Sequence, residues 1–353
     1  MVEQPNKSVI FKKIPEGTPA KGEHLVLEDR PLDLDASPPE GGLVVRNLYF
    51  SFDPYQRGRM RDVKSESYSP AYPLGEPIRN SMICKVISSG TEKFGKDDLI
   101  TNYMSGPLQE YTILEKHDLG ENVWKLENKH DLDPALFLGP LGMTGLTAYS
   151  SFYEIGQPKK GETIFISAAS GAVGSLVGQL AKREGLKVIG SVGSDEKLDY
   201  ILQDLGFDAG FNYKKEDPMD ALPHLAPDGI DIYFENVGGR HLEAAISSFR
   251  LFGRTVVCGM IGDYNKPFEK KYGVKNLQVI FEKRLSLRGF IVADFQDKYY
   301  AEHQKNCQAW LVDGSLKGKL HKTAGIDNAI DGLLELFDGK NFGKAVLQID
   351  TSQ

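Results

Sequence analysis

Cysteine is scarce in this sequence, and the three cysteines lie far apart, at Cys84, Cys258 and Cys307. An odd number of dispersed cysteines without a Cys-x-x-Cys pair matches neither the disulfide framework of small secreted domains nor a zinc ribbon. The seven histidines are equally dispersed. We therefore predict a protein of a reducing compartment, with no metal site.

Long apolar runs are missing as well. No stretch has the roughly 20 consecutive apolar residues that a membrane-spanning helix needs. Residues 3–8 are polar, so the N-terminus lacks the apolar core of a secretory signal. The net charge of −7 disfavours a surface for nucleic acid, which requires clustered Lys and Arg. We expect a cytoplasmic protein that binds neither membranes nor nucleic acids.

The composition, with 41% hydrophobic and 26% charged residues, is that of a globular protein, and 353 residues suit two domains. The first third predicts strands at residues 43–52, 82–87 and 110–114, separated by Pro and Gly. From residue 163 to 292, short apolar segments alternate with amphipathic ones. This alternation predicts an α/β fold with a doubly wound parallel sheet.

Within that alternation the sequence predicts strands at 163–167, 187–192, 230–234, 255–258 and 285–292, and helices at 172–183, 195–202 and 240–248. Beyond it we expect helices near 299–311 and 329–337 and a strand at 344–349. The tail is interpreted as a return to the β-rich domain. The expected division is therefore 1–130 and 294–353 for a catalytic domain, and 131–293 for a cofactor domain.

The strongest motif lies where the first strand of the alternation meets its helix. Ala168, Gly171 and Gly174 form an A-x-x-G-x-x-G version of the dinucleotide fingerprint. Small residues let the backbone approach a pyrophosphate, and the helix N-terminus at Ala172 and Val173 offers unpaired N–H groups. The alternative is that these glycines only permit close packing of the helix. The strand–turn–helix context favours a cofactor cradle.

The end of the second strand indicates which cofactor binds. Sites that prefer NAD place Asp or Glu there to bind the ribose hydroxyls. Here Gly193 and Ser194 leave room for a 2′-phosphate, and Lys197 supplies a cation that can reach it. Asp195 would favour NAD if it pointed inward, but as the first residue of a helix it also suits a capping role. The sequence favours NADP(H), although Lys197 is also compatible with a plain surface position.

Several further segments extend along the chain: Asp53-Pro54-Tyr55 and residues 142–149, 193–197, 211–214, 234–239, 258–259, 264–265, 288–290 and 341–344. With the cradle, they resemble the prostaglandin reductase and alkenal double-bond reductase branch of the medium-chain dehydrogenase/reductase superfamily. The resemblance covers nearly the whole chain. It implies a Rossmann domain inserted into a GroES-like catalytic domain, NADPH as hydride donor, and a homodimer.

The resemblance also implies cofactor-binding positions. Lys197 and Tyr213 match residues that hold the 2′-phosphate, and Met143 and Thr144 match the segment under the nicotinamide. The remaining matches lie along the cofactor groove or at its ends, at Asn236, Cys258, Gly259, Phe290, Val292 and Asn341.

Two departures from relatives matter. Zinc alcohol dehydrogenases of the superfamily carry a Gly-His-Glu segment, where this chain has Gly75-Glu76-Pro77, and they carry a four-cysteine lobe that this chain lacks. A zinc Lewis acid is therefore not expected, and alcohol oxidation by that route is disfavoured. Gln56 stands where relatives often have Met, which bears on the substrate pocket.

A metal-free reductase needs a substrate whose acceptor carbon is already electrophilic, and a conjugated carbonyl provides one. We expect hydride transfer to the β-carbon of an α,β-unsaturated aldehyde or ketone, with hydrogen-bond donors aimed at the carbonyl oxygen. Tyr264 is the first candidate donor, and Tyr55 is a weaker one; each is also compatible with a packing role. The alternatives are a quinone reductase and a catalytically silent NADPH-binding protein.

Overall fold

The computed structural model describes residues 3–349, which form two compact units. The first comprises residues up to Leu138 together with Leu320–Asn341 and the segment from Ala345 onward; the second comprises Gly139–Lys319 and Phe342–Lys344. The predicted return at residue 294 thus differs from this division, because the second unit continues to Lys319. The assignment of the units as catalytic and cofactor domains stays a prediction.

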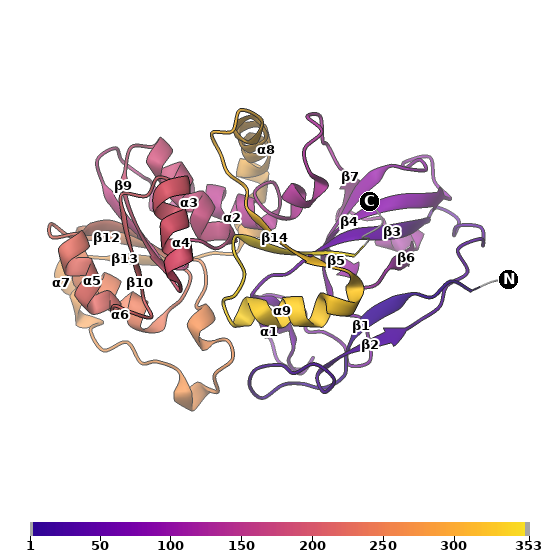
Figure 1. The fold of residues 1–353 in the computed structure, drawn as a ribbon, viewed down its shortest axis with the longest axis horizontal. Coiled ribbons are helices and arrows are strands. Elements are labelled where there is room, and N and C mark those ends of the chain that lie inside the picture. The colour runs from indigo at the N-terminus through magenta and orange to yellow at the C-terminus, as the bar shows by residue number, and fades with distance from the viewer. Residues whose placement is uncertain (1–2, 350–353) are drawn as a thin grey trace. The chain divides into compact units, whose positions relative to one another are not determined.

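The first unit is built on a mixed sheet with the strand order β14-β15-β3-β4-β5-β7, and β6 pairs with β3 (Figure 1). A separate antiparallel pair, β1-β2, accompanies it. Its strands and helices are β1 (Lys7–Phe11), β2 (Leu25–Asp29), β3 (Leu43–Ser51), α1 (Gln56–Arg59), β4 (Arg79–Ser89), β5 (Leu99–Pro107), β6 (Tyr111–Leu114), β7 (Val123–Lys125), β14 (Leu320–Ala324), α9 (Ala329–Phe337) and β15 (Lys344–Gln348).

Alternating and apolar runs explain these strands. The residues of β3 are almost entirely buried, because one face of the strand packs on the core and the neighbouring strands β4, β6 and β15 cover its edges. The core of this unit contains Phe50, Phe52 and Leu347, which are at most 1% exposed. The C-terminal strand thereby completes a sheet that the N-terminal third begins, as the sequence predicts.

The second unit has a six-stranded parallel sheet with the order β10-β9-β8-β11-β12-β13. Figure 1 labels β9, β10, β12 and β13 of this sheet. This is the strand order of dinucleotide-binding Rossmann sheets. Its elements are α2 (Met143–Ser151), β8 (Thr163–Ile166), α3 (Ala172–Arg183), β9 (Lys187–Val192), α4 (Asp195–Asp199), β10 (Ala209–Asn212), α5 (Pro218–Leu225), β11 (Ile230–Glu235), α6 (Gly239–Ser248), β12 (Phe249–Val257), α7 (Gln278–Lys283), β13 (Ser286–Gly289) and α8 (Gln296–Val312).

The predicted fold class is correct, and one strand is shorter than expected. The predicted strand 285–292 ends at Gly289, and its last predicted residue, Val292, begins a 3-10 turn over Val292–Phe295. Order in this sheet reverses between β8 and β11, and ligands of open α/β sheets bind at the carboxyl ends of strands at such a point. Within residues 3–349, no helix combines the length and apolar character that crossing a bilayer requires.

Candidate functional site

The turn between β8 and α3 has the geometry of a phosphate cradle. Ala168 adopts a left-handed backbone with φ of 49°, and its carbonyl accepts the N–H of Gly171 at 3.0 Å. A Cβ atom on Gly174 would lie 2.5 Å from that carbonyl oxygen, so only glycine fits there. The first-turn N–H groups of α3 have no intrahelical partner by construction, which makes this helix start suitable for an anion.

A C-terminal segment of the chain closes one side of this turn. Gly343 forms an isolated parallel bridge with Gly171, and its N–H donates to the Ser170 carbonyl at 3.0 Å. Because Phe342–Lys344 belongs to the second unit, this contact lies within it. Asn341, the predicted contact from the C-terminal side, directly precedes this segment and belongs to the first unit.

Asn236 ties the two central strands together at their carboxyl ends. Its side-chain amide donates to the Ser167 carbonyl at 2.7 Å, and its backbone N–H donates to the Ser167 hydroxyl at 2.9 Å. Since Ser167 follows β8 and Asn236 follows β11, both residues lie at the point where strand order reverses. Asn236 therefore holds the ends of β8 and β11 together at the place where the cofactor groove is predicted.

Glu235, to which the sequence assigns no catalytic part, has a structural role. It is fully buried, and its Oε1 accepts the N–H groups of Val237 at 2.7 Å and Gly238 at 2.8 Å. The Tyr233 hydroxyl donates to the same oxygen at 2.8 Å. Burial raises the pKa of Glu235. This carboxyl caps the turn between β11 and α6 and so fixes the position of Asn236.

The end of β9 gathers the residues predicted to choose the cofactor. The Ser194 hydroxyl caps α4 by accepting the backbone N–H of Lys197 at 3.3 Å. A Cβ on Gly193 would lie 3.0 Å from the Tyr213 hydroxyl, so Tyr213 lies against this turn. Burial, followed by the nearby Lys214 ammonium, lowers the pKa of Lys197. Two cations close together at a strand end favour a bound anion.

The Asp195 carboxylate binds two protein side chains rather than pointing toward a ribose. Its Oδ1 accepts from the Asn212 amide at 2.9 Å, and its Oδ2 pairs with Lys215. These two partners lower the pKa of the Asp195 carboxyl, with the Asn212 hydrogen bond as the larger cause. Asp195, which would have favoured NAD, is thus bound by residues of β10 and of the turn that follows β10.

The end of β12 places Tyr264 against the backbone of the predicted groove. The N–H groups of Cys258 and Gly259 donate to the Glu235 carbonyl at 3.0 and 3.1 Å. The Tyr264 hydroxyl accepts the N–H of Met260 at 3.3 Å, and a Cβ on Gly259 would lie 3.0 Å from that hydroxyl. Burial raises the pKa of the Cys258 thiol to about 12, so it stays protonated. The phenol of Tyr264 therefore lies at the carboxyl edge of the parallel sheet.

The other predicted positions of the second unit lie on neighbouring elements. Met143 and Thr144 begin α2, where the Thr144 hydroxyl donates to the Gly139 carbonyl at 3.1 Å. Phe290 follows β13 and stacks on Phe295 with 5.8 Å between ring centroids. Val292, which is 9% exposed, is the first residue of the 3-10 turn that follows β13.

In the first unit, Tyr55 belongs to a buried polar network. The Tyr55 hydroxyl donates to Asn80 Oδ1 at 2.6 Å, and Asn80 Nδ2 donates to the Asp53 carboxylate at 2.9 Å. The Ser51 hydroxyl donates to the same Asp53 oxygen. Asp53 is 2% exposed and Asn80 is fully buried. Burial, with the Asp53 charge adding to it, holds the pKa of Tyr55 well above its usual range.

Gln56, the departure from relatives, extends this network. Its Oε1 accepts the backbone N–H of Asp53 at 2.8 Å, and its Nε2 donates to the Tyr72 hydroxyl at 3.2 Å. The guanidinium of buried Arg59 lies 4.3 Å from the Tyr72 ring centroid and donates to the Pro70 carbonyl at 3.0 Å. Gln56 and Arg59 thereby fasten the end of the following loop to the Asp53 turn.

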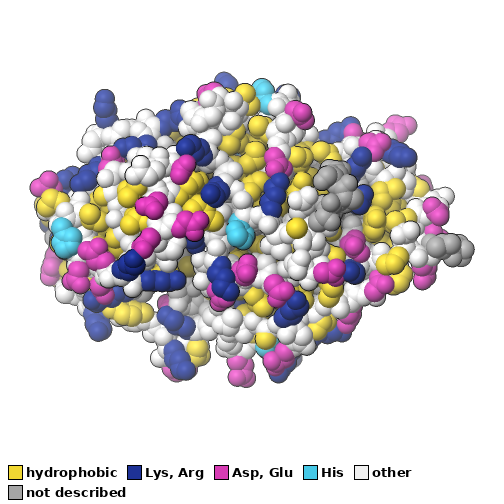
Figure 2. All heavy atoms as spheres, viewed as in Figure 1, with side chains coloured by type: hydrophobic (Ala, Val, Ile, Leu, Met, Phe, Trp, Pro, Cys, Tyr) yellow, Lys and Arg dark blue, Asp and Glu magenta, His cyan; other side chains and the backbone are white. Residues whose placement is uncertain are grey.

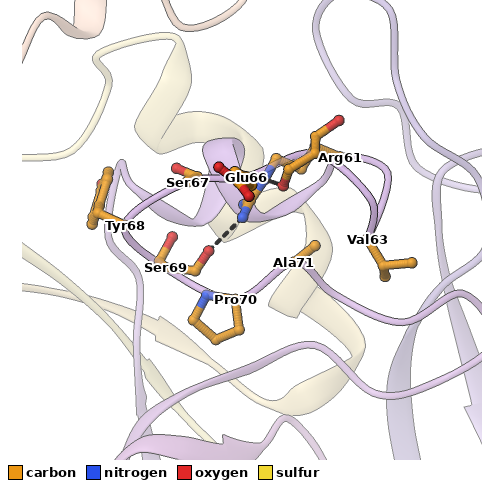
Figure 3. Close-up of a pocket in the computed structure, with 9 residues that line it drawn as sticks. Arg61, Val63, Glu66, Ser67, Tyr68, Ser69, Pro70 and Ala71 are labelled. Carbon is orange, nitrogen blue, oxygen red and sulfur yellow. Dashed lines mark hydrogen bonds between the residues drawn. The ribbon is translucent and has the colours of Figure 1, made fainter.

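That loop lines an open pocket of about 570 Å³, formed by Arg61, Val63, Ser65, Glu66, Ser67, Tyr68, Ser69, Pro70 and Ala71 (Figure 3). Arg61 reaches across the loop and donates to the carbonyls of Gly58 at 2.8 Å, Ser65 at 3.0 Å and Ser69. Because all three donating nitrogens bind backbone oxygens, Arg61 holds the loop in shape and is poorly placed to bind an anion.

Sequence reasoning missed Asn80 and the bracing role of Gln56. Neither has a local signal, since Asn80 is the second residue of β4 and lies 27 positions from Asp53 in the chain. The predicted residues Gly193, Ser194, Lys197 and Tyr213 do come together, as do Asn236, Gly259 and Tyr264. Tyr55 and Tyr264 belong to different units.

Across residues 3–349, no three His, Cys, Asp or Glu side chains gather in a way that could hold a metal ion. Acidic and basic side chains are interspersed over the face seen in Figure 2. The absence of zinc from the reaction remains a prediction.

Comparison with known proteins identifies the family. The profile described as "Zinc-binding dehydrogenase" matches residues 172–305, and that described as "N-terminal domain of oxidoreductase" matches residues 7–121. The NADP-dependent oxidoreductase RED1 of Cochliobolus heterostrophus is 52% identical, over 98% of this chain and 97% of that protein. The chain belongs to the medium-chain dehydrogenase/reductase superfamily.

Two further members of this superfamily bear on the site. The NADP(+)-dependent 2-alkenal reductase of Nicotiana tabacum is 41% identical over 98% of each chain. The crystal structure of CurA from Vibrio vulnificus in complex with NADPH matches with a TM-score of 0.87 and 33% identity, over 98% of this chain and 99% of that one. The predicted family and the predicted fold are thus confirmed.

Proposed function

We propose that this medium-chain dehydrogenase/reductase reduces the carbon–carbon double bond of α,β-unsaturated aldehydes and ketones. The chain is an NADP(H)-dependent oxidoreductase, and the substrate class is proposed in addition to that activity. The substrate class rests on one observation above others, the Tyr264 phenol held at the carboxyl edge of the parallel sheet. The 41% identity to a 2-alkenal reductase over 98% of both chains supports the same class.

The cofactor fits the residues present. The Gly174 position has no room for a Cβ, and half-buried Lys197 stands beside a second lysine at the end of β9. Ala168, Gly171, Ala172, Val173 and Gly174 would hold the pyrophosphate through the backbone and the start of α3. Ser194, Lys197 and Tyr213 would hold the 2′-phosphate. When bound, NADPH supplies the hydride that the β-carbon of the conjugated carbonyl accepts.

The chain's own contribution is to stabilise charge. Negative charge develops on the carbonyl oxygen of the substrate as its β-carbon is reduced, and an oriented hydroxyl can donate a hydrogen bond to it. Tyr264 is the proposed donor. Its oxygen is fixed by the Met260 N–H, which restricts the direction in which the hydroxyl can donate. No metal takes part in this proposal, and a homodimer is proposed from the family resemblance.

The deciding experiment measures NADPH oxidation by the purified protein with a medium-chain 2-alkenal, an aryl enone and a quinone in parallel. We expect consumption with both conjugated carbonyls and saturated carbonyl products by mass spectrometry. Allylic alcohol products, or turnover of the quinone alone, would refute the proposal. Metal analysis of the same sample should find less than stoichiometric zinc, and light scattering should report twice the chain mass.

A further inference from the structure

Asn80 joins the Asp53 carboxylate to the Tyr55 hydroxyl. Its Nδ2 donates to Asp53 Oδ2 and to the Ser51 carbonyl, both at 2.9 Å. Its Oδ1 accepts the Tyr55 hydroxyl at 2.6 Å. The register of the β4–β5 pair shifts between Asn80 and Met82, and such irregularities redirect side chains.

The orientation of the Asn80 amide follows from its partners. A carboxylate oxygen and a backbone carbonyl only accept hydrogen bonds, so the NH₂ group must face Asp53 and Ser51. The flipped amide would put its oxygen against both acceptors and lose two hydrogen bonds inside a fully buried site. The Asn80 oxygen is therefore fixed on the side of Tyr55.

This orientation decides what Tyr55 can do. A carbonyl oxygen offers no hydrogen, so the Tyr55 hydroxyl must be the donor of the 2.6 Å bond. A phenol has a single hydrogen, and donating it to Asn80 leaves only the lone pairs of the oxygen, toward which the Arg59 guanidinium also donates, for any further partner. Tyr55 is thus set up to accept a hydrogen bond rather than to donate one.

We infer that Asn80, held by Asp53, is a positioning residue that fixes Tyr55 as a hydrogen-bond acceptor for a bound group carrying a hydroxyl or amide donor. The inference rests on the proposed function only in taking Tyr55 as part of the substrate or cofactor site. By accepting that donor, Tyr55 orients the group that carries it.

If the network served the fold alone, replacing Asn80 would lower stability as replacing any comparable buried asparagine does, without a specific loss of turnover. Asn47 offers the matched control, because it is also fully buried in the same sheet and its Nδ2 donates to Gln109 O and Thr112 Oγ1 at 2.8 Å. Replacement of either asparagine removes two buried donor bonds. Only Asn80 also contacts Tyr55.

The test is a double-mutant cycle of Asn80→Ala and Tyr55→Phe, with Asn47→Ala as control and the thermal midpoint of every variant recorded. We expect each single change at Asn80 or Tyr55 to lower kcat/KM about tenfold, the scale of a modest misplacement of reacting groups. The double variant should be no slower than Tyr55→Phe, because Asn80 acts through the hydroxyl that this variant lacks. Asn47→Ala should lose stability but keep kcat/KM within about twofold.

Additive losses in the double variant would overturn the inference, and so would an unchanged rate in Tyr55→Phe. If Asn80→Ala fails to fold, Asn80→Ser replaces it, since a serine cannot reach both Asp53 and Tyr55. If the wild type reduces only a quinone, the proposed enone function fails, but the same cycle on the quinone still tests Asn80.

A second measurement does not depend on turnover. Tyrosine labelled with ¹³C at Cζ reports the hydrogen bonding of its hydroxyl, and the Tyr55→Phe spectrum identifies the Tyr55 signal. We expect Asn80→Ser to shift that signal and Asn47→Ala to leave it in place. An unshifted Tyr55 signal in Asn80→Ser would contradict the hydrogen bond itself, whatever the activity.

Discussion

The two units position their candidate site residues by different means. In the second unit the cradle is made of backbone groups, and its determinants, Ala168, Gly171 and Gly174, lie within seven residues of one another. In the first unit Tyr55 is held by side chains, through Asn80 on β4 and Asp53 after β3. One arrangement depends on small residues that leave space, and the other depends on polar groups that fill it.

The difference bears on how each region tolerates substitution. A backbone cradle is indifferent to most side chains around it but cannot accept an added Cβ where space is missing. A buried polar network can accept changes of volume more readily than the loss of one partner, because an unsatisfied buried group costs the full desolvation penalty. Five predictions separate these behaviours.

The largest expected effect is a loss of folding stability at acidic pH, and it arises from two histidines of the second unit. Burial lowers the pKa of both His241 and His303 to about 4, against 6.5 when exposed. The unfolded chain therefore binds more protons, so stability is full above pH 6.5 and is lost as the pH falls toward 4. Urea unfolding at pH 7 and pH 5 should differ by about 2 kcal/mol for each histidine. His303→Gln should remove about half of that difference. If the difference between pH 7 and pH 5 is unchanged in this variant, His303 is not a source of the acid sensitivity.

Tyr264→Phe tests the donor at the edge of the parallel sheet. Loss of a single donor to a developing oxyanion lowers turnover about 100-fold, and we expect that loss in kcat with NADPH affinity unchanged. Tyr272→Phe is the control, since Tyr272 lies in the same unit and its hydroxyl donates to Glu243 at 3.0 Å. Equal turnover in both variants would show that Tyr264 only packs against its neighbours and donates no hydrogen bond in the reaction.

Gly174→Ala tests the space requirement of the cradle. Its Cβ would lie 2.5 Å from the Ala168 carbonyl oxygen and 3.0 Å from the Ala169 Cα. We expect a loss of about 2 kcal/mol in stability, typical of forced overpacking, together with weaker NADPH binding. Gly171→Ala, whose Cβ would lie 3.2 Å from the same oxygen, should lose clearly less stability. Equal losses in the two variants would contradict the steric account.

Lys197→Ala tests cofactor choice. We expect NADPH affinity, measured by fluorescence titration, to fall about tenfold while NADH affinity changes little, because only NADPH carries the 2′-phosphate. Lys215→Ala, which removes the partner of Asp195, should change neither affinity appreciably. Equal effects of Lys197→Ala on the two cofactors would remove this lysine from the phosphate site.

The smallest expected effect belongs to the first unit. Gln56→Met introduces the residue that relatives often have and is close to isosteric, but it removes the acceptor of the Asp53 N–H and the amide that donates to the Tyr72 hydroxyl. The Tyr72 hydroxyl keeps its bond to the Arg79 carbonyl at 2.8 Å. We expect a loss of about 1 kcal/mol in chemical denaturation. A more stable variant would show that the network at Gln56 is dispensable to the fold.

Much of the second unit could be predicted from the sequence, since its signals are local. The strand entering Ala168–Gly174 and the strand ending at Val192 both occur where expected. The strand expected at 285–292 is shorter, because Val292 begins a turn whose Asp294 carboxylate accepts the Ile291 N–H at 2.9 Å. Periodicity alone does not detect such a capping contact.

The sequence by itself determined the fold class, the cradle and the favoured cofactor of this protein. Each of these follows from residues close together in the chain, where spacing and side-chain size act directly on the backbone. Only the tertiary structure decided that Asp195 pairs with Lys215, that Gln56 braces Tyr72, and that Asn80 faces Tyr55. Those contacts join residues up to 25 positions apart, and a side chain's partner at such a separation is set by how strands and loops pack.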